Sequence, residues 1–273
     1  MRGNDVNSEA DIGGLFAPER VAVVGATERE GSIGAAIVRN LDDFTGEVVP
    51  VNPSRDTVFG RQCYPDVASV PGEVDLAVVV VPPSIAVDAV REAGEAGVTN
   101  VVVVTAGFSE TGSEGAQREQ ELRAVAAEYD LQLVGPNSLG VLSTPANLNA
   151  TFGPSNALPG SLSFMSQSGA FITAVLDWAN DQGIGFKDVV SLGNKAVLDE
   201  SDFLAHWRDD PETNVILGYL EGVEDGREFI DTAREVTQDT PVVVVKSGRT
   251  EAGAEAASSH TGTIAGSEAA YEA

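Results

Sequence analysis

The chain has 273 residues, of which 42 are acidic and 16 basic, so its formal net charge is −26. A charge of this sign and size repels polyanions and anionic lipid, which argues against nucleic acid and membranes as partners. A single cysteine excludes a disulfide framework. No long apolar run indicates a signal peptide or a membrane-spanning helix, so we expect a cytoplasmic protein. The acidic excess is also typical of halophilic proteins.

Residues 1–14 are polar and acidic, and we expect them to form a flexible lead-in. Residues 15–146 alternate between short apolar runs and segments with helical spacing. The expected strands are residues 20–25, 47–51, 75–81, 100–105 and 131–134, and the expected helices are 35–41, 85–96 and 114–129. Strands that alternate with helices predict a parallel, doubly wound first domain.

Residues 147–160 are rich in Asn, Pro and Gly and are predicted to be a linker. A second alternation follows in residues 161–273. The expected strands are residues 161–165, 188–191, 215–220 and 241–245, and the expected helices are 170–182, 202–208 and 227–236. Both domains are therefore predicted to be α/β, each a parallel sheet flanked by helices.

The first strand leads into a glycine-rich turn, residues 25–34, that ends where a helix begins. Such a turn can bind phosphate through its backbone N–H groups, although a plain connection without ligand has the same pattern. The next strand ends at Asn52, where a dinucleotide site would have an acidic residue to hold a ribose. This residue argues against an NAD-dependent dehydrogenase.

One of the two histidines, His260, lies among small residues after the strand at 241–245. Ligands of open parallel sheets collect at that edge, and a neutral imidazole can form covalent intermediates. The turn at residues 166–169 has the composition of an anion site, and Glu221 ends a strand in the same layer, where it could orient the ring. An ordinary loop histidine, a helix cap and a solvated acid are the alternative interpretations. No metal site is predicted.

Seven motifs occur in a single order along the chain. They are Gly25-Ala26-Thr27, Gly31-Ser32-Ile33-Gly34, Val51-Asn52-Pro53, Ala106-Gly107-Phe108-Ser109-Glu110, Gly135-Pro136-Asn137, Ser166-Gln167-Ser168-Gly169 and Ser259-His260-Thr261-Gly262. Together they resemble the α part of the ADP-forming acetyl-CoA synthetases (acetate–CoA ligases), relatives of succinyl-CoA synthetase. The resemblance covers nearly everything after Leu15. It implies a Rossmann-like CoA-binding domain followed by a flavodoxin-like succinyl-CoA-ligase domain.

The resemblance also implies roles for individual residues. His260 would carry a phosphoryl group, Glu221 would orient its ring, and phosphate would lie at the turn formed by Ser166, Gln167, Ser168 and Gly169. The implied CoA-binding residues are Gly25, Ala26, Thr27, Ser32, Asn52, Arg55, Pro82, Gly107, Phe108 and Asn137. The implied reaction converts acyl-CoA, ADP and phosphate reversibly into a small carboxylic acid, ATP and CoA, through an acyl phosphate and phosphohistidine.

The chain departs from the family in three places. Ser54 follows Val-Asn-Pro where relatives often have Lys, and Arg55 can substitute for it as a phosphate contact. Ser138 follows Gly-Pro-Asn where relatives often have Cys. The family continues beyond Ala273 into an ATP-grasp domain, so we expect this chain to be a fragment of an oligomer. ADP or ATP with Mg²⁺ would bind only to that domain, fused or present as a β subunit.

An alternative is a CoA-binding regulatory module, or one associated with an acetyltransferase, without ligase activity. His260 discriminates between the two readings, because a module that only binds CoA does not need a nucleophile at this position.

Overall fold

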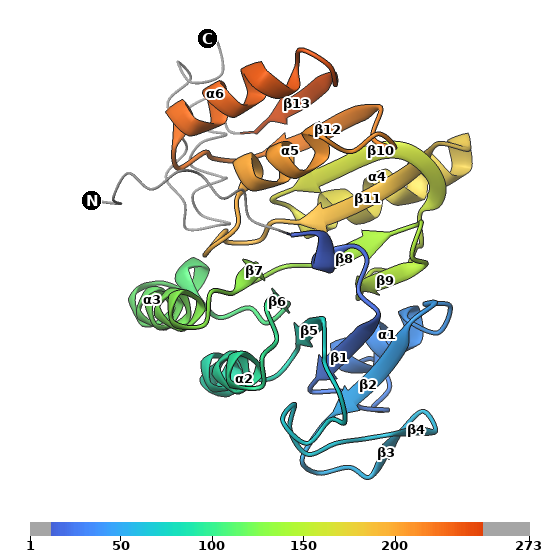
Figure 1. Ribbon diagram of the computed structural model, residues 1–273, viewed down its shortest axis with the longest axis vertical. Helices are drawn as coiled ribbons and strands as arrows, with labels where there is room; N and C mark the ends of the chain where they lie inside the picture. Colours follow the sequence, from blue (N-terminus) through green and yellow to red (C-terminus); the bar gives the residue numbers. More distant parts are fainter. Residues whose placement is uncertain (1–11, 248–273) are drawn as a thin grey trace.

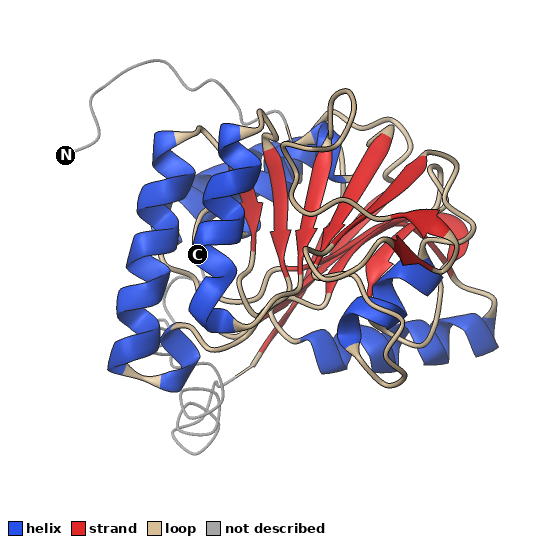
Figure 2. Cartoon of the chain, turned by 90° about the horizontal axis from the view of Figure 1, so that it is seen from below, coloured by secondary structure: helices blue, strands red, loops and turns tan. Residues whose placement is uncertain are grey.

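Apolar runs rich in valine and leucine form the strands of two sheets, which lie one above the other in Figure 1. The structure is a computed structural model and describes residues 12–247. Seen from below, helices lie on both sides of the strands (Figure 2). The predicted α/β class and the order of two domains are therefore confirmed.

The first sheet is parallel and has the strand order β2-β1-β5-β6-β7. Its strands are β1 (Arg20–Val24), β2 (Glu47–Val51), β5 (Leu76–Val79), β6 (Asn100–Val103) and β7 (Gln132–Val134), and its helices are α1 (Ile33–Asn40), α2 (Pro83–Glu95) and α3 (Ser113–Glu128). Every residue of β5 and β6 is buried, as expected of strands covered on both faces. Because the chain crosses from β2 over β1 to β5, a ligand crevice is expected at the carboxyl ends of β1 and β5.

The second sheet has the order β13-β12-β10-β11-β8-β9. Four strands are parallel, namely β10 (Leu158–Ser166), β11 (Gly185–Ser191), β12 (Val215–Leu220) and β13 (Val242–Lys246), and the helices are α4 (Gly169–Gln182), α5 (Glu200–Arg208) and α6 (Gly226–Val236). Strands β8 (Gly140–Ser143) and β9 (Leu148–Thr151) form an antiparallel hairpin at one edge. The parallel sheet predicted for this half is thus correct for four strands and extended by two others.

The hairpin β8–β9 changes the division of the chain expected from its sequence. Strand β8 pairs with β11 and β9 pairs with β8, so residues 140–151 belong to the second sheet, whereas we expected the first domain to continue to residue 146 and a linker to span 147–160. The composition was misleading because a hairpin turn uses the same residues as a linker: Asn147 has a φ of 48°, in the left-handed region that Asn tolerates. A small hairpin of β3 (Thr57–Val58) and β4 (Arg61–Gln62) was also not predicted.

The start of the described chain joins the two domains. A 3-10 turn, η1 (Gly13–Leu15), is preceded by Ile12, which is 1% exposed, so the expected flexible lead-in does not extend to residue 14. Phe16 then stacks on His206 of α5, with 5.5 Å between the ring centroids. The hydrophobic cluster around these residues includes side chains of both domains, among them Val102 and Val134 of the first sheet, Leu192 after β11 and Trp207 of α5. The two domains therefore share one core.

Candidate functional site

A cavity of about 1470 Å³ lies between the two domains. The first domain lines it with the turns that follow β1, β2, β5 and β6, and the second domain with the start of α4 and the end of β12. The cavity brings together many of the residues singled out from the sequence, namely Gly25, Thr27, Ser32, Asn52, Arg55, Pro82, Asn137, Gln167, Ser168, Gly169 and Glu221. Their convergence follows from the shared position of these turns at the carboxyl ends of parallel strands.

The glycine-rich turn after β1 is packed too closely for larger residues. Gly25 has a φ of +99°, and a Cβ on it would lie 2.7 Å from the carbonyl oxygen of Val80. A Cβ on Gly34 would lie 2.6 Å from the carbonyl oxygen of Gly25. Ser32 caps α1, because its Oγ accepts the N–H of Ala35 at 3.3 Å. The turn thus brings backbone and a helix N-terminus to the cavity wall, an arrangement suited to a phosphate group.

Asn52 connects this turn to the end of β2. Its Nδ2 donates to the carbonyl of Ala26 at 2.8 Å, and its Oδ1 accepts the N–H of Ser54 at 2.9 Å. An aspartate could not make the first of these bonds, because a carboxylate has no donor. The amide of Asn52 therefore stabilises the turn itself, whether or not a ligand is bound. Ala26, expected at the CoA site, is fully buried and does not line the cavity.

Gly107 and Phe108 were expected to line the path of CoA, and the structure does not place them there. Phe108 is fully buried, and a Cβ on Gly107 would lie 2.9 Å from that of Pro83. The turn is organised by Glu110, whose Oε1 accepts the N–H groups of both residues, at 2.5 and 3.1 Å. Arg118 donates to the carbonyl of Gly107. Gly107 and Phe108 therefore maintain the structure of the turn, and Ala106 of the same motif lines the cavity.

In the turn before α4, some polar groups line the cavity and others form hydrogen bonds within the turn. Ser168 is the N-cap, and its Oγ accepts the N–H of Phe171 at 3.3 Å. Ser166 is fully buried; its Oγ accepts the N–H of Ser168 and donates to the carbonyl of the same residue, at 3.0 and 2.9 Å. The hydroxyl of Ser166 is thus engaged in the turn. We expected it to contact phosphate, but it does not line the cavity. Ser168 and Gly169 line it.

Gln167 joins the start of α4 to the end of β12. Its Oε1 accepts the N–H groups of Glu221 and Gly222, at 2.5 and 3.0 Å. Glu221 lines the cavity, and Nζ of Lys246 donates to its carbonyl at 2.8 Å. Burial lowers the pKa of Lys246, and the charge of Glu221 partly opposes the shift. Glu221 and the α4 N-terminus therefore lie on the same wall. His260 lies outside the described residues.

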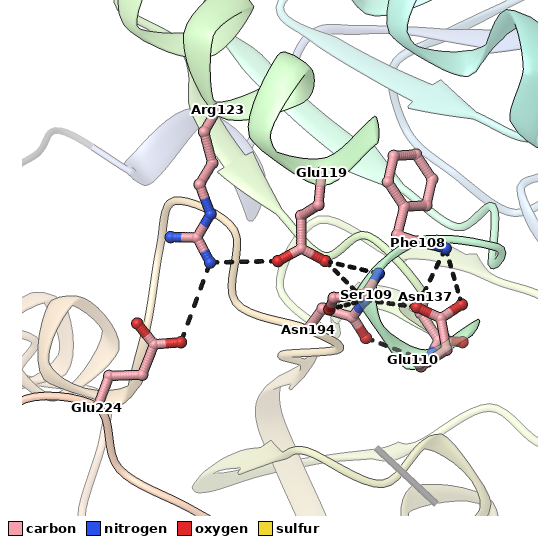
Figure 3. Close-up of polar contacts among 8 residues, drawn as sticks. All are labelled: Phe108, Ser109, Glu110, Glu119, Arg123, Asn137, Asn194 and Glu224. Carbon is pink, nitrogen blue, oxygen red and sulfur yellow. Dashed lines mark hydrogen bonds and ion pairs between the residues drawn. The ribbon is translucent and has the colours of Figure 1, made fainter. Parts of the chain in front are cut away.

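Asn137 lies at the junction of the two domains (Figure 3). Its φ is 59°, and its Nδ2 donates to Oδ1 of Asn194, at 3.3 Å. Nδ2 of Asn194 in turn lies 2.6 Å from Oε2 of Glu110 and 2.9 Å from Oε2 of Glu119. Burial would raise the pKa of Glu110, but hydrogen bonds from Asn194 and from the turn outweigh it and lower the pKa. Sequence reasoning missed the role of Asn194, because its partners Glu110 and Glu119 lie 84 and 75 positions away along the chain.

Charged side chains of both signs line the part of the cavity formed by the first domain. Arg29 and Arg55 are cationic, and Asp66, Asp88 and Glu92 are anionic. Only Arg55 of these was expected from the sequence. Within residues 12–247 no cluster of His, Cys, Asp and Glu could hold a metal ion. None of the helices described there is long and apolar enough to span a bilayer.

Two domain families match the chain. Residues 19–144 match the CoA binding domain family, and residues 159–273 match the succinyl-CoA ligase like flavodoxin domain family. These matches agree with the expected order of domains.

Known proteins show the same combination. The chain is 52% identical to "Acetate--CoA ligase [ADP-forming] I" of Archaeoglobus fulgidus, over 95% of this chain and 38% of that protein. It is 46% identical to "Acetate--CoA ligase [ADP-forming] I subunit alpha" of Pyrococcus furiosus, over 95% of this chain and 57% of the subunit. Among solved structures, the dinucleotide forming acetyl-coenzyme A synthetase 1 of Ca. Korarchaeum cryptofilum, in complex with phosphate and ADP, has a TM-score of 0.91 and 47% identity, over 96% of this chain and 57% of that one. The chain therefore spans less than two thirds of each of these relatives.

Proposed function

We propose that this chain, which belongs to the family of the ADP-forming acetate–CoA ligases that it resembles in sequence and fold, is the α part of such a ligase. The observation that carries the proposal is a cavity that the two domains share. One wall is the glycine-rich edge of the CoA-binding sheet, and the other holds Glu221 and the N-terminus of α4. A coenzyme thioester and a phosphate can therefore meet in one space.

CoA binds along the first wall in this proposal. Its phosphates lie at the turn of residues 25–34, where backbone N–H groups and the start of α1 favour anions. Arg29 and Arg55 add cationic side chains to the same wall. The thioester lies toward Asn137, next to the second domain. Asn137 lines the cavity and is held there by its hydrogen bond to Asn194.

The chemistry proceeds in two transfers. An oxygen of phosphate attacks the thioester carbonyl, the C–S bond breaks, and CoA leaves as the thiolate with an acyl phosphate as the other product. A ring nitrogen of His260 then attacks the phosphorus, the bond from phosphorus to the acyl oxygen breaks, and the carboxylic acid leaves as its anion. The α4 N-terminus stabilises the phosphate charge in both steps, and the Glu221 carboxylate orients the ring.

The second half of the reaction needs a nucleotide site. We propose that an ATP-grasp domain, fused or present as a separate subunit, binds ADP with Mg²⁺ and receives the phosphoryl group from His260. One relative is named as a subunit and the other is a longer chain, which agrees with both arrangements. We also propose that the protein works at high salt, because the net charge of −26 would otherwise repel CoA and phosphate.

The test is to incubate the full chain with acetyl-CoA and ³²P-labelled phosphate. We expect protein-bound label that is stable to base and labile to acid, together with release of CoA thiol. The label should be absent in His260→Ala and present in His206→Gln, a control at the only other histidine in the chain. Absence of label from the wild type, or label that survives His260→Ala, would overturn the ligase proposal and leave a module that only binds CoA.

A further inference from the structure

The turn formed by Glu221 and Gly222, here called the acid turn, has all four of its backbone hydrogen-bonding groups bound by side chains. Oε1 of Gln167 accepts both N–H groups, at 2.5 and 3.0 Å. Nζ of Lys246 donates to the carbonyl of Glu221 and Nζ of Lys195 to that of Gly222, each at 2.8 Å. Loops more commonly satisfy such groups with backbone or water. The acid turn is instead fixed from three directions.

The use of lysine makes this arrangement unusual. The chain has only three lysines, at positions 187, 195 and 246, and two of them donate to the acid turn. Both lysines come from strand ends that are remote from the turn along the chain. Lys195 follows β11, and Lys246 ends β13. In a chain with only three lysines, the contact of two of them with one two-residue turn points to a local role.

Lys195 occupies its position despite two unfavourable features. Its backbone is left-handed, with a φ of 57°, which is costly for a residue with a Cβ. Its ammonium group is buried and paired with Glu200 at 2.9 Å, the two side chains being 2% and 1% exposed. Burial raises the pKa of Glu200, and the charge of Lys195 opposes that shift. A buried ion pair is a weak source of stability, so its contact with the acid turn calls for another explanation.

The segment that carries Lys195 is itself held against the first domain. The N–H of Asn194 donates to the carbonyl of Pro136, and that of Ala196 to the carbonyl of Gly135, both at 2.8 Å. A Cβ on Gly193 would lie 2.1 Å from the Pro136 oxygen, so the two segments are in close contact. The ammonium group of Lys195 therefore reaches the acid turn from a fixed base.

We propose that Lys195, held by Glu200, and Lys246 are positioning residues for phosphoryl transfer. They fix the acid turn so that Glu221 keeps one position on the cavity wall. The inference rests on the proposed function, because it concerns the same site. The lysines act through the backbone of the acid turn, and their effect is on the transfer rate and not on coenzyme binding.

Three variants of the full chain test the inference. Lys195→Met removes the donor but leaves Glu200 as a buried charge without its partner, and it can fail to fold. The double variant Lys195→Met/Glu200→Leu removes both charges and keeps the volume apolar, which such pairs tolerate. Lys187→Met is the matched control, since Lys187 also forms an ion pair in the second domain, with Asp210, but at the opposite end of β11.

We expect the double variant to bind CoA as the wild type does and to keep its KM for acetyl-CoA. Its rate of labelling from acetyl-CoA and ³²P-phosphate should fall about 10- to 100-fold, the range for a small misplacement of a catalytic group. The control should label at the wild-type rate whatever it loses in thermal stability. A folded double variant that labels as fast as the wild type would overturn the inference.

Hydrogen exchange separates this inference from the proposed function. Amides of Glu221 and Gly222 should exchange faster in the double variant and remain protected in Lys187→Met, even if the wild type forms no phosphohistidine. Unlabelled wild-type protein with this exchange pattern would reject the ligase proposal while leaving the acid turn fixed as described. Equal exchange in the double variant and the control would reject the role of Lys195.

Discussion

The side-chain oxygen of Gln167 lies 2.5 Å from the backbone nitrogen of Glu221, and this bond joins the helix that should bind phosphate to the carboxylate that should orient the nucleophile. Gln167→Leu removes the acceptor and leaves two N–H groups without their partner. We expect a loss of about 1–3 kcal/mol in the free energy of unfolding, together with slower labelling and unchanged CoA affinity. Chemical unfolding and calorimetric titration measure these quantities.

Gln167→Glu is the companion variant. A carboxylate can still accept both N–H groups, but its charge repels phosphate in the cavity. Compared with Gln167→Leu, Gln167→Glu should therefore regain more of the free energy of unfolding than of the labelling rate. Equal unfolding free energies for the wild type and Gln167→Leu would contradict the assigned hydrogen bonds.

Gly193→Ala should destabilise the contact between the two domains. Gly193 has a φ of +58°, and its Cβ would lie 2.1 Å from the carbonyl oxygen of Pro136. Gly183 ends α4 with a similar φ of +69° and has open space around the Cβ position, so Gly183→Ala is the control for backbone conformation alone. Gly183→Ala should cost about 1–2 kcal/mol, and Gly193→Ala clearly more. Similar melting temperatures for both variants would show that the contact yields easily.

Glu110→Gln should change the dependence of stability on pH. Because the folded protein holds the pKa of Glu110 below its ordinary value of 4.5, the ionised group stabilises the fold above that pH, and the contribution is lost as the pH falls through the folded pKa. The variant should be less stable at pH 7, by about 1.5 kcal/mol, and approach the wild type below about pH 4.5. Unfolding at several pH values and constant salt measures the difference.

Glu114→Gln is the control for this pH experiment. Glu114 lies four residues after Glu110, in the first turn of α3, and its side chain is 91% exposed. Among the ion pairs described, it pairs only with Arg118. We expect little change at any pH, as for most exposed pairs. A stability difference for Glu110→Gln that stayed constant from pH 7 into the acid range would refute the proposed titration.

Arg29→Ala and Arg55→Ala should each weaken CoA binding. Both side chains line the cavity near the glycine-rich turn, where a charge-assisted bond to phosphate is expected. The loss should be about tenfold in Kd for each, and smaller at high salt. Arg61→Ala is the control, because Arg61 pairs with Asp42 and does not line the cavity. Equal affinity for CoA in all three variants would contradict the proposed position of the CoA phosphates beside the glycine-rich turn.

Salt should stabilise the protein strongly. The net charge of −26 means that self-repulsion dominates at low ionic strength, and screening reduces it. We expect the thermal midpoint to rise steadily between about 0.1 and 2 M KCl. A midpoint that does not change over this range would contradict a high-salt origin.

Helices and parallel strands could be predicted within a few residues because glycine, proline and polar turns border each apolar run. The strand at 215–220 agrees at both ends with β12. The hairpin β8–β9 could not be recognised, since its pairing with β11 depends on residues some fifty positions away. Composition does not report such pairing.

The turns that we singled out from the sequence meet at one cavity, but not every side chain named in them lines it. Cavity residues such as Thr27 and Asn52 lie where parallel strands end, which the order of elements specifies. Phe108 and Ser166 are fully buried, because part of each motif maintains the turn that presents the rest. Lys195 was missed because its partner Gly222 is 27 residues away along the chain.

The common core limits where this polypeptide could be divided. Val102 and Val134 of one sheet and Leu192 and Trp207 beside the other belong to a single cluster, so a cut between the sheets would expose apolar surface on both pieces. Gene fission that preserves folding should therefore spare residues 12–247 as one unit. The Pyrococcus furiosus subunit, which aligns with 95% of this chain, agrees with that expectation.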